Sequence, residues 1–237
     1  MINNKVAICL HQTSHPGNIG SVARAMKTMN LSDLRLIDCV DHNSSDAYAM
    51  ACGADDILFH AKTYPDLNQA LSDCHLVFGL SARPRTDKRK ILLSTQLNEV
   101  FSQITPSNQL AFLFGNERTG LDNAALSLCH SQIIIPTNPD YHSLNLSQAV
   151  QIIAYLVSTY ERSPKPFSLP TKNVASHEKK AAIIYRLEQL LAGSKLINIQ
   201  NPQSSLSKVL DILHRAQLDN DEADLLCGIL KQLHNGK

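Results

Sequence analysis

The chain has 237 residues, which suits one large domain or one medium domain with a small partner. Hydrophobic residues make up 43% and charged residues 18% of the sequence, a globular composition that excludes a disordered or collagen-like chain. The 22 basic and 21 acidic residues give a formal charge of +1, which excludes a strongly basic nucleic-acid clamp and an acidic tail protein but allows a local basic patch.

The first 160 residues alternate between short apolar runs rich in β-branched residues and longer stretches of helical character. The apolar runs predict buried strands at 6–10, 34–38, 76–80, 110–114 and 133–136, with a weaker one at 57–59. The stretches between them predict helices at 21–29, 46–51, 67–73, 92–104 and 122–128. Strands separated by helices indicate βαβ units, and so an α/β fold with a mostly parallel sheet.

Residues 146–161 are apolar on most sides, so this helix must be buried against the sheet or against another subunit. Prolines at positions 164, 166 and 170 then predict a linker over 162–174. Three amphipathic helical patterns follow, and their small core predicts that they dock on something larger. We therefore expect one domain over 1–161, a proline-rich linker over 162–174 and a small helical extension over 175–237.

The six cysteines indicate an intracellular protein. None forms a Cys-x-x-Cys pair and most lie in apolar runs, so we interpret them as small buried side chains, not as a disulfide framework or a zinc site. The start, MINNKVAICL, lacks the basic and long apolar regions of a secretory signal, and no apolar run reaches the roughly 18 residues of a membrane span. We expect a cytoplasmic protein with no membrane segment and no structural metal.

Ligands of open α/β sheets bind beyond the carboxyl ends of the strands, so the loops after the strands carry the candidate site. The first such loop opens a helix after a turn between Gly17 and Gly20, and helix N-termini suit anions. It matches neither a phosphate-binding P-loop nor the GxGxxG fingerprint. Asp38 is a partial match to the ribose-binding acid of dinucleotide folds, although a capping or solvated aspartate is the simpler interpretation. Arg24 on the following helix is, taken alone, an ordinary surface arginine.

Three later loops carry unusual polar side chains at strand ends. Residues 83–90 hold five basic side chains and one acid, which suits either a solubilising loop or a phosphate-backbone contact. The segment GNERTGL places Glu117 and Arg118 between two glycines, where such charge is unusual without partners. Ser143 and Asn145 open the long helix, where capping alone would explain either of them. Their convergence on one sheet edge favours a binding site.

The loops resemble, in order, the three motifs of the SPOUT RNA ribose methyltransferases of the TrmH type. The first motif is Asn-x-Gly with a following arginine, here Asn18, Gly20 and Arg24. The second is Gly-x-Glu-x-x-Gly-Leu at 115–121, and the third is an Ile-Pro turn leading to Ser-Leu-Asn at 135–145. Further detail is similar to the branch that methylates cytidine or uridine 32 in the tRNA anticodon loop. The resemblance covers residues 1–160 well and 175–235 loosely.

This resemblance implies a sheet tied into a C-terminal trefoil knot, S-adenosylmethionine as the methyl donor, tRNA as the substrate and a homodimer. It implies that the cofactor is bound by Leu80, Ser81, Ala82, Gly115, Ile135, His142, Ser143 and Leu144. It assigns the catalytic group to Arg24, Asn18, Glu117, Ser143 and Asn145.

Arg24 matches the family arginine that acts on the ribose hydroxyl. An arginine stays charged in proteins and is a poor base, so we expect it to act electrostatically, by holding the adjacent phosphate and lowering the hydroxyl pKa. Glu117 is expected to orient Arg24 or its neighbours, within the chain or across a dimer. Asn18 and Asn145 would position backbone and substrate, and Ser143 would bond near the nucleophile.

The distribution of charge indicates where tRNA would bind. Residues 1–160 hold 11 basic and 13 acidic side chains, a net charge of −2, whereas residues 161–237 hold 11 and 8, a net charge of +3. The basic loop and the stretch 162–186, with six basic residues against one acid, are the candidate contacts. The expected RNA-binding residues are Arg24, Arg83, Arg85, Lys88, Arg89, Lys90 and Tyr141. The tyrosine could stack on a base or be a simple surface aromatic.

Three alternatives stay open. One is a SPOUT methyltransferase that acts on another tRNA position or on ribosomal RNA. Another is a non-catalytic RNA-binding module of the same fold, which the joint presence of the five catalytic residues disfavours. The third is a nicotinamide oxidoreductase, which the missing glycine fingerprint disfavours.

Overall fold

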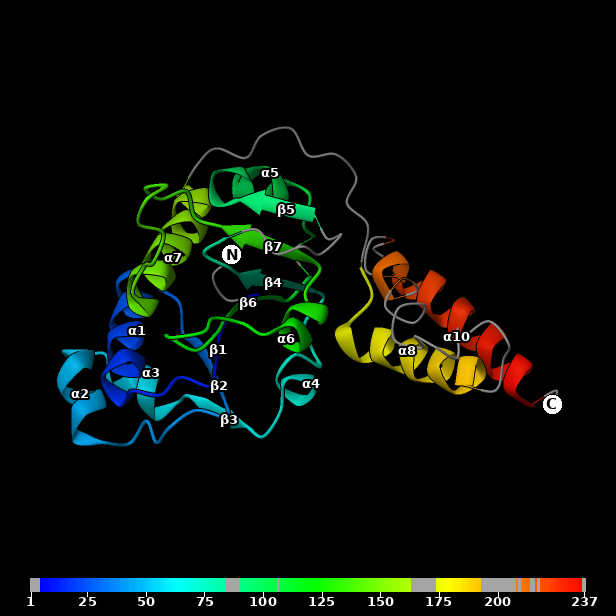
Figure 1. The fold of residues 1–237 in the computed structure, drawn as a ribbon, viewed down its shortest axis with the longest axis horizontal. Helices are drawn as coiled ribbons and strands as arrows, with labels where there is room; N and C mark the ends of the chain where they lie inside the picture. The colour runs from blue at the N-terminus through cyan, green and yellow to red at the C-terminus, as the bar shows by residue number, and fades with distance from the viewer. Residues whose placement is uncertain are drawn as a thin grey trace.

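The computed structural model describes residues 5–83, 90–105, 107–162, 174–192, 208, 210–213, 216 and 218–235. Its centre is a seven-stranded sheet in which all paired strands run parallel, in the order β3-β2-β1-β6-β4-β7-β5 (Figure 1). The strands are β1 (Val6–His11), β2 (Asp33–Ile37), β3 (Lys62–Tyr64), β4 (Leu76–Leu80), β5 (Lys90–Leu93), β6 (Leu110–Phe114) and β7 (Ser131–Ile134). The predicted α/β fold with a parallel sheet is confirmed.

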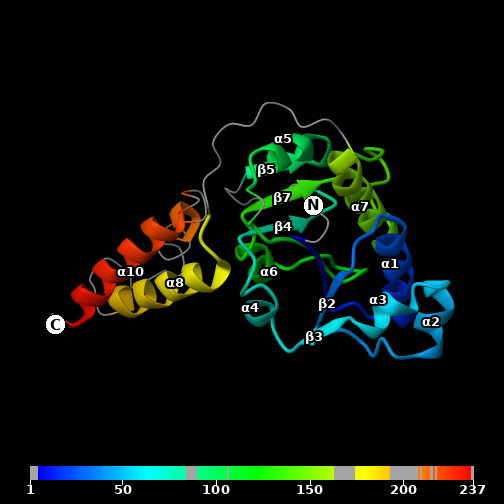
Figure 2. The same ribbon diagram turned by 180° about the vertical axis from the view of Figure 1, so that it is seen from behind.

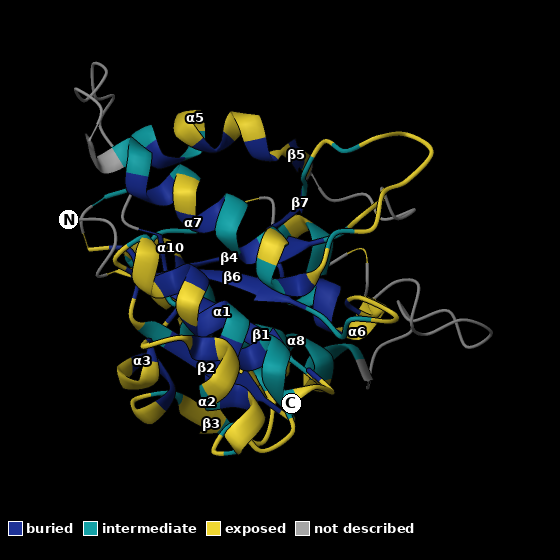
Figure 3. Cartoon of the chain, turned by 90° about the vertical axis from the view of Figure 1, so that its left-hand side faces the viewer, coloured by how far each residue is buried: buried dark blue, intermediate teal, exposed yellow. Residues whose placement is uncertain are grey.

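Helices cover both faces of this sheet, which is why β1, β4 and β6 read as continuous apolar runs (Figures 1 and 2). One face packs against α1 (Pro16–Thr28), α2 (Ser45–Ala51), α3 (Asp55–Phe59), α5 (Leu97–Ser102) and α7 (Leu146–Arg162). The other packs against α4 (Leu67–Ala70) and α6 (Asn123–Ser127). Figure 3 shows the buried strands beneath helices whose outer sides are exposed.

One element expected from sequence is wrong in type, and another is wrong in its extent. Residues 57–59 belong to helix α3, and the strand beside β2 is β3, three residues later. An apolar run of three residues fits a buried turn of helix as well as a strand, so periodicity could not separate them. The helix expected over 92–104 begins with the end of strand β5, and α5 itself is only six residues long.

Helix α7 is buried on more than one side, as its composition predicted. Val150, Ile153, Ala154 and Val157 are buried in the core shared with the sheet. Helices α1 and α5 pack along α7, and Tyr155 is the large apolar side chain that it leaves exposed. The second apolar side is therefore largely covered within one chain.

The helical extension docks on the same chain. Helices α8 (His177–Ala192) and α10 (Asn220–Asn235) pack on each other around Ile183, Ala223 and Leu230. The first turn of α8 donates backbone hydrogen bonds to the turn before β4, from His177 N to the Cys74 carbonyl (2.7 Å) and from Glu178 N to the Ser72 carbonyl (3.1 Å). Arg162 still belongs to α7, and residues 163–173 lie outside the described part, so the linker stays a prediction.

Lys180 fixes this docking. It is only 6% exposed, and its Nζ lies 2.8 Å from His130 Nε2 and donates to the His75 carbonyl at 3.1 Å. Its neighbour Lys179 forms an ion pair with Asp224 at 2.8 Å. The stretch 162–186 was predicted as an RNA contact, and for Lys180 that prediction is wrong because the side chain is buried between the two units.

Within the described residues, no helix is long and apolar enough to span a membrane, and no cluster of His, Cys, Asp and Glu could hold a metal ion. All six cysteines belong to the described residues, and none of them forms a disulfide. Three of them, Cys9, Cys74 and Cys129, are buried, whereas Cys52 is exposed at the end of α2.

Candidate functional site

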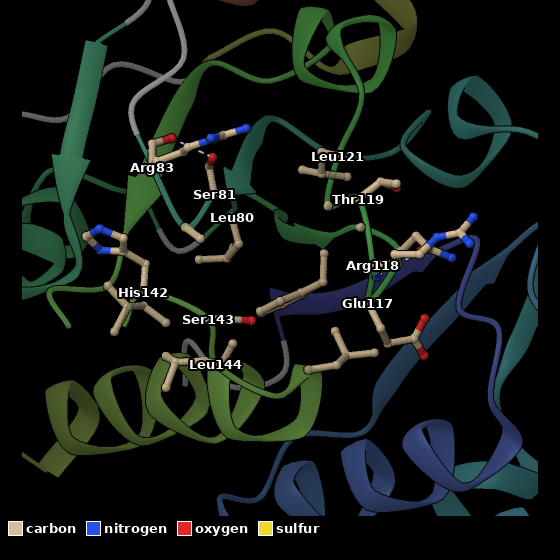
Figure 4. Close-up of a pocket in the computed structure, with 18 residues that line it drawn as sticks. Leu80, Ser81, Arg83, Glu117, Arg118, Thr119, Leu121, His142, Ser143 and Leu144 are labelled. Carbon is tan, nitrogen blue, oxygen red and sulfur yellow. Dashed lines mark hydrogen bonds between the residues drawn. The ribbon is translucent and has the colours of Figure 1, made fainter. Parts of the chain in front are cut away.

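A cavity of about 470 Å³ opens at the carboxyl ends of β4, β6 and β7 (Figure 4). Residues 80–83, 114–121 and 142–144 line it, together with Ile135 and with Leu146 and Ala149 of α7. The loops converge because β6, β4 and β7 are consecutive in the sheet order, although their carboxyl ends at 80, 114 and 134 are 34 and 20 positions apart in the chain. The volume lies in the range of about 300–1,000 Å³ typical of small-molecule and cofactor sites.

All eight residues predicted to bind a cofactor line this cavity: Leu80, Ser81, Ala82, Gly115, Ile135, His142, Ser143 and Leu144. The loop after β6 closes tightly on itself. A Cβ on Gly115 would lie 2.2 Å from the carbonyl carbon of Gly120, and Gly120 itself has φ of +69°. Glycine is required at both positions, because any side chain at the first would overlap backbone and the second favours a left-handed residue.

Glu117 joins the second motif to the first. Its Oε1 accepts a hydrogen bond from Asn18 Nδ2 at 2.8 Å, and its Oε2 accepts from the backbone and hydroxyl of Ser14, both at 3.1 Å. Partial burial opposes ionisation, but the hydrogen bonds outweigh it and hold the pKa of Glu117 below its usual value. The carboxylate thus stays charged and ties the start of α1 to the cavity loop.

Arg24 does not line the cavity of its own chain. The side chain is exposed, and its Nη1 lies 3.6 Å from Cys52 Sγ at the end of α2. Asn18 and Arg24 are six residues apart, which places them on different sides of a helix with 3.6 residues per turn. Glu117 was expected to orient Arg24 or its neighbours, but within the chain its carboxylate is bonded by Asn18 and Ser14.

The third motif divides between the cavity and the helix start. Ser143 lines the cavity, and Figure 4 shows its hydroxyl pointing toward the middle. Asn145 caps α7, where its Oδ1 accepts from the backbone (2.9 Å) and hydroxyl (2.8 Å) of Ser147. Tyr141 is 74% exposed beside His142, and its backbone N donates to the Asn138 carbonyl.

The predicted basic loop reaches the cavity through Arg83, whose carbonyl accepts from Ser81 Oγ at 2.7 Å. Arg85, Lys88 and Arg89 lie outside the described residues, as does the side chain of Lys90, the first residue of β5. Asp38 accepts from Gln12 Nε2 at 3.1 Å and is not on the cavity lining, as expected for an ordinary polar cap and not for a ribose ligand.

Sequence reasoning assigned no role to three residues of this site. Ser14 holds Glu117, Asn116 Nδ2 donates to the Gln12 carbonyl at 2.6 Å, and Arg118 lines the cavity. The signal for Arg118 was its position between two glycines at a strand end. The contacts of Ser14 and Asn116 join residues about 100 positions apart, and no local pattern marks them.

Comparison with known proteins identifies the family. Residues 5–155 match the SpoU rRNA Methylase family. The tRNA (cytidine/uridine-2'-O-)-methyltransferase TrmJ of Sodalis glossinidius is 37% identical over 99% of this chain and 93% of its own length, and that of Pectobacterium atrosepticum is 38% identical over 98% of each. The crystal structure of TrmJ from Z. mobilis ZM4 covers 96% of this chain and 98% of its own, with a TM-score of 0.83 and 28% identity. The chain belongs to the SpoU rRNA Methylase family.

Proposed function

We propose that this protein is a tRNA 2′-O-methyltransferase that transfers a methyl group from S-adenosylmethionine to the ribose of cytidine or uridine 32. The observation that carries the proposal is the meeting of the second and third motif loops around one cavity, with the first motif tied to it through Asn18 and Glu117. Relatives named tRNA (cytidine/uridine-2'-O-)-methyltransferase align over almost the whole chain.

The chemistry of the cavity suits S-adenosylmethionine. Leu80, Ile135 and Leu144 offer apolar contacts for an adenine ring, and the hydroxyls of Ser81 and Ser143 offer hydrogen bonds. Among the described lining residues, Glu117 is the one carboxylate, and Asn18 and Ser14 already engage it. When bound, the cofactor supplies an electrophilic methyl group on a positively charged sulfur.

The protein residues would then align the ribose and assist loss of its hydroxyl proton. Ser143 would hold the ribose near the nucleophilic oxygen, since its hydroxyl faces the cavity. Asn18 and Glu117 keep α1 in register with the cavity loop. Arg24 would act electrostatically, on the phosphate beside the target and on the hydroxyl pKa, because a guanidinium does not give up its proton. Asn145 contributes by fixing the start of α7.

We further propose a homodimer in which Arg24 serves the cavity of the second copy, since its side chain is exposed and does not line the cavity of its own chain. A trefoil knot is supported by the sheet order, in which β7 is inserted between β4 and β5, two strands that follow each other along the chain. The RNA contacts would come from Arg83, the rest of the basic loop, Tyr141 and Arg24, and the site of action would be the cytoplasm.

The deciding experiment incubates the protein with labelled S-adenosylmethionine and total tRNA and maps 2′-O-methyl nucleotides by mass spectrometry. Methylation at position 32 is the expected result. A signal at another position, or only in ribosomal RNA, would reassign the substrate. No incorporation into any RNA would favour a non-catalytic RNA-binding module.

A further inference from the structure

Arg118 is a second arginine at the mouth of the cavity, and the proposed methyl transfer assigns it no role. Arg118 lies on the β6–α6 loop, lines the cavity and is exposed. Figure 4 shows it beside Glu117, on the side opposite Arg83 and His142, with its guanidinium pointing away from Ser143. The two arginines thus stand on opposite sides of the same opening.

The adjacent carboxylate does not neutralise Arg118. Glu117 would be its default ion-pair partner, but Asn18 takes one oxygen and Ser14 the other. Within the described part of the chain, no carboxylate or other hydrogen-bond acceptor engages the guanidinium of Arg118. An arginine whose neighbouring acid is already engaged by other donors, and which no described acceptor engages, is available to an external anion.

The backbone that carries Arg118 is fixed. Its own N–H donates to Asn116 Oδ1 at 3.0 Å, and Gly120 N donates to the Asn116 carbonyl at 2.8 Å. Asn116 is in turn anchored to the Gln12 carbonyl at the end of β1. The base of the side chain is therefore held in place, so less conformational freedom is lost when the guanidinium binds.

We propose that Arg118 binds a phosphate of the RNA substrate and sets the position of the target nucleotide over the cavity. This rests on the proposed function. Two anions could reach the residue, an RNA phosphate and the carboxylate of the cofactor. The outward direction of the guanidinium and its exposure favour the RNA, because a cofactor group would lie inside the cavity. An arginine binds phosphate with two parallel hydrogen bonds, which fixes orientation as well as charge.

The test compares Arg118→Ala with the wild-type protein on a tRNA anticodon stem-loop at saturating cofactor. We expect the KM for RNA to rise about tenfold with kcat changed much less, as for loss of one charge-assisted contact. The slope of log(kcat/KM) against log[salt] should become shallower by about 0.7, the value for one phosphate in single-stranded RNA. Arg118→Lys keeps the charge and should recover part of the KM and the full salt slope.

Stem-loops with single methylphosphonate linkages near the target identify the phosphate. One neutralised linkage should weaken RNA binding by the wild-type protein and leave RNA binding by Arg118→Ala unchanged. Lys62→Ala is the matched control, since this exposed lysine lies on β3 at the far edge of the sheet, and it should change neither KM nor slope.

Two results would overturn the proposal: unchanged KM and slope in Arg118→Ala, or a tenfold weaker cofactor Kd by calorimetry with unchanged RNA affinity, which would make Arg118 a cofactor ligand. RNA affinity by fluorescence anisotropy separates this inference from the proposed function. A wild-type protein that binds the stem-loop through Arg118 without methylating it would refute the function alone.

Discussion

The contact between Asn18 and Glu117 is the residue-scale feature on which the site depends. It joins a helix start to a loop 99 positions away, and it holds a half-buried carboxylate in its charged form. Ser14 adds two longer contacts to the other oxygen, one of which comes from the backbone N–H and is kept when the side chain is replaced by alanine. The two side chains therefore contribute unequally to the same carboxylate.

Asn18→Ala should lower the free energy of unfolding by about 1–3 kcal/mol, the cost of leaving a charged acceptor without its donor. Ser14→Ala is the matched control and should cost less, because its backbone bond remains. The depressed pKa of Glu117 contributes stability that is present above the usual glutamate pKa and lost as pH falls through the lowered one. Urea denaturation should thus give a penalty for Asn18→Ala at pH 7 that shrinks below about pH 4. An equal penalty at both pH values would contradict this account.

At the scale of elements, the close approach of α1 and α2 explains a glycine that the first motif carries. A Cβ on Gly20 would lie 2.0 Å from the carbonyl oxygen of Ala47, inside the backbone of the neighbouring helix. A Cβ on Gly17, one turn earlier, would lie 3.3 Å from Cγ of the flexible Met50 side chain and at an ordinary 4.0 Å from the Asp46 carbonyl oxygen. The contact at Gly20 is with helix backbone and cannot relax unless a helix moves. The contact at Gly17 can relax by a change in the Met50 side chain.

Gly20→Ala should therefore destabilise the protein by about 3 kcal/mol, the upper part of the usual range for overpacking. Gly17→Ala should change the free energy of unfolding by less than about 1 kcal/mol, because a methionine side chain can adapt. Thermal or urea unfolding of the two variants, measured side by side, checks the difference. Equal effects would mean that α1 and α2 do not approach each other as closely as the structure has them.

At the scale of the whole molecule, a buried amine joins the helical extension to the sheet domain. Val77 N donates to His130 Nδ1 at 2.9 Å, so the proton of the neutral ring lies on Nε2. The 2.8 Å contact from Nε2 to Lys180 Nζ is then a hydrogen bond only if the lysine is uncharged. Burial lowers the pKa of Lys180 to about 8, which agrees with this geometry. His75, whose carbonyl also bonds Lys180, has its own pKa lowered by burial and titrates at lower pH.

Stability should consequently depend on pH through Lys180. The unfolded chain keeps this proton up to about pH 10.4, whereas the folded chain releases it near 8, so Lys180 raises the unfolding free energy as pH rises between these values. Buried thiols such as Cys9 and Cys74, whose pKa values are raised by burial, act in the opposite direction over the same interval. The quantity to measure is therefore the difference in unfolding free energy between wild type and Lys180→Met. From pH 8 to 10 this difference should change in favour of the wild-type protein. A constant difference would show that the amine is not neutralised on docking.

The proposed dimer makes a prediction about shared sites. Arg24→Ala alone should abolish methylation while cofactor binding by calorimetry persists, and Ser143→Ala alone should also impair methylation severely. If Arg24 serves the partner's cavity, co-expression of the two variants should restore about a quarter of wild-type activity. Half of the dimers would then be mixed, and one of the two sites in each mixed dimer would be intact. Failure of the mixture to recover activity would place both residues in the same subunit's site.

The sequence by itself determined the alternation of strands and helices, the parallel sheet and the loops that line the cavity. The elements follow from local periodicity, and the choice of loops follows from the rule that ligands bind at strand ends. The eight cofactor residues came from the resemblance to the methyltransferase family, and all eight line the cavity. Only the tertiary structure decided the insertion of β7 between β4 and β5, the short strand β3, the bond between Glu117 and Asn18, and the burial of Lys180. Each of these depends on a contact between residues far apart in the chain. The residues next to a side chain in the sequence do not determine which distant donor, strand or helix it will contact in the folded chain.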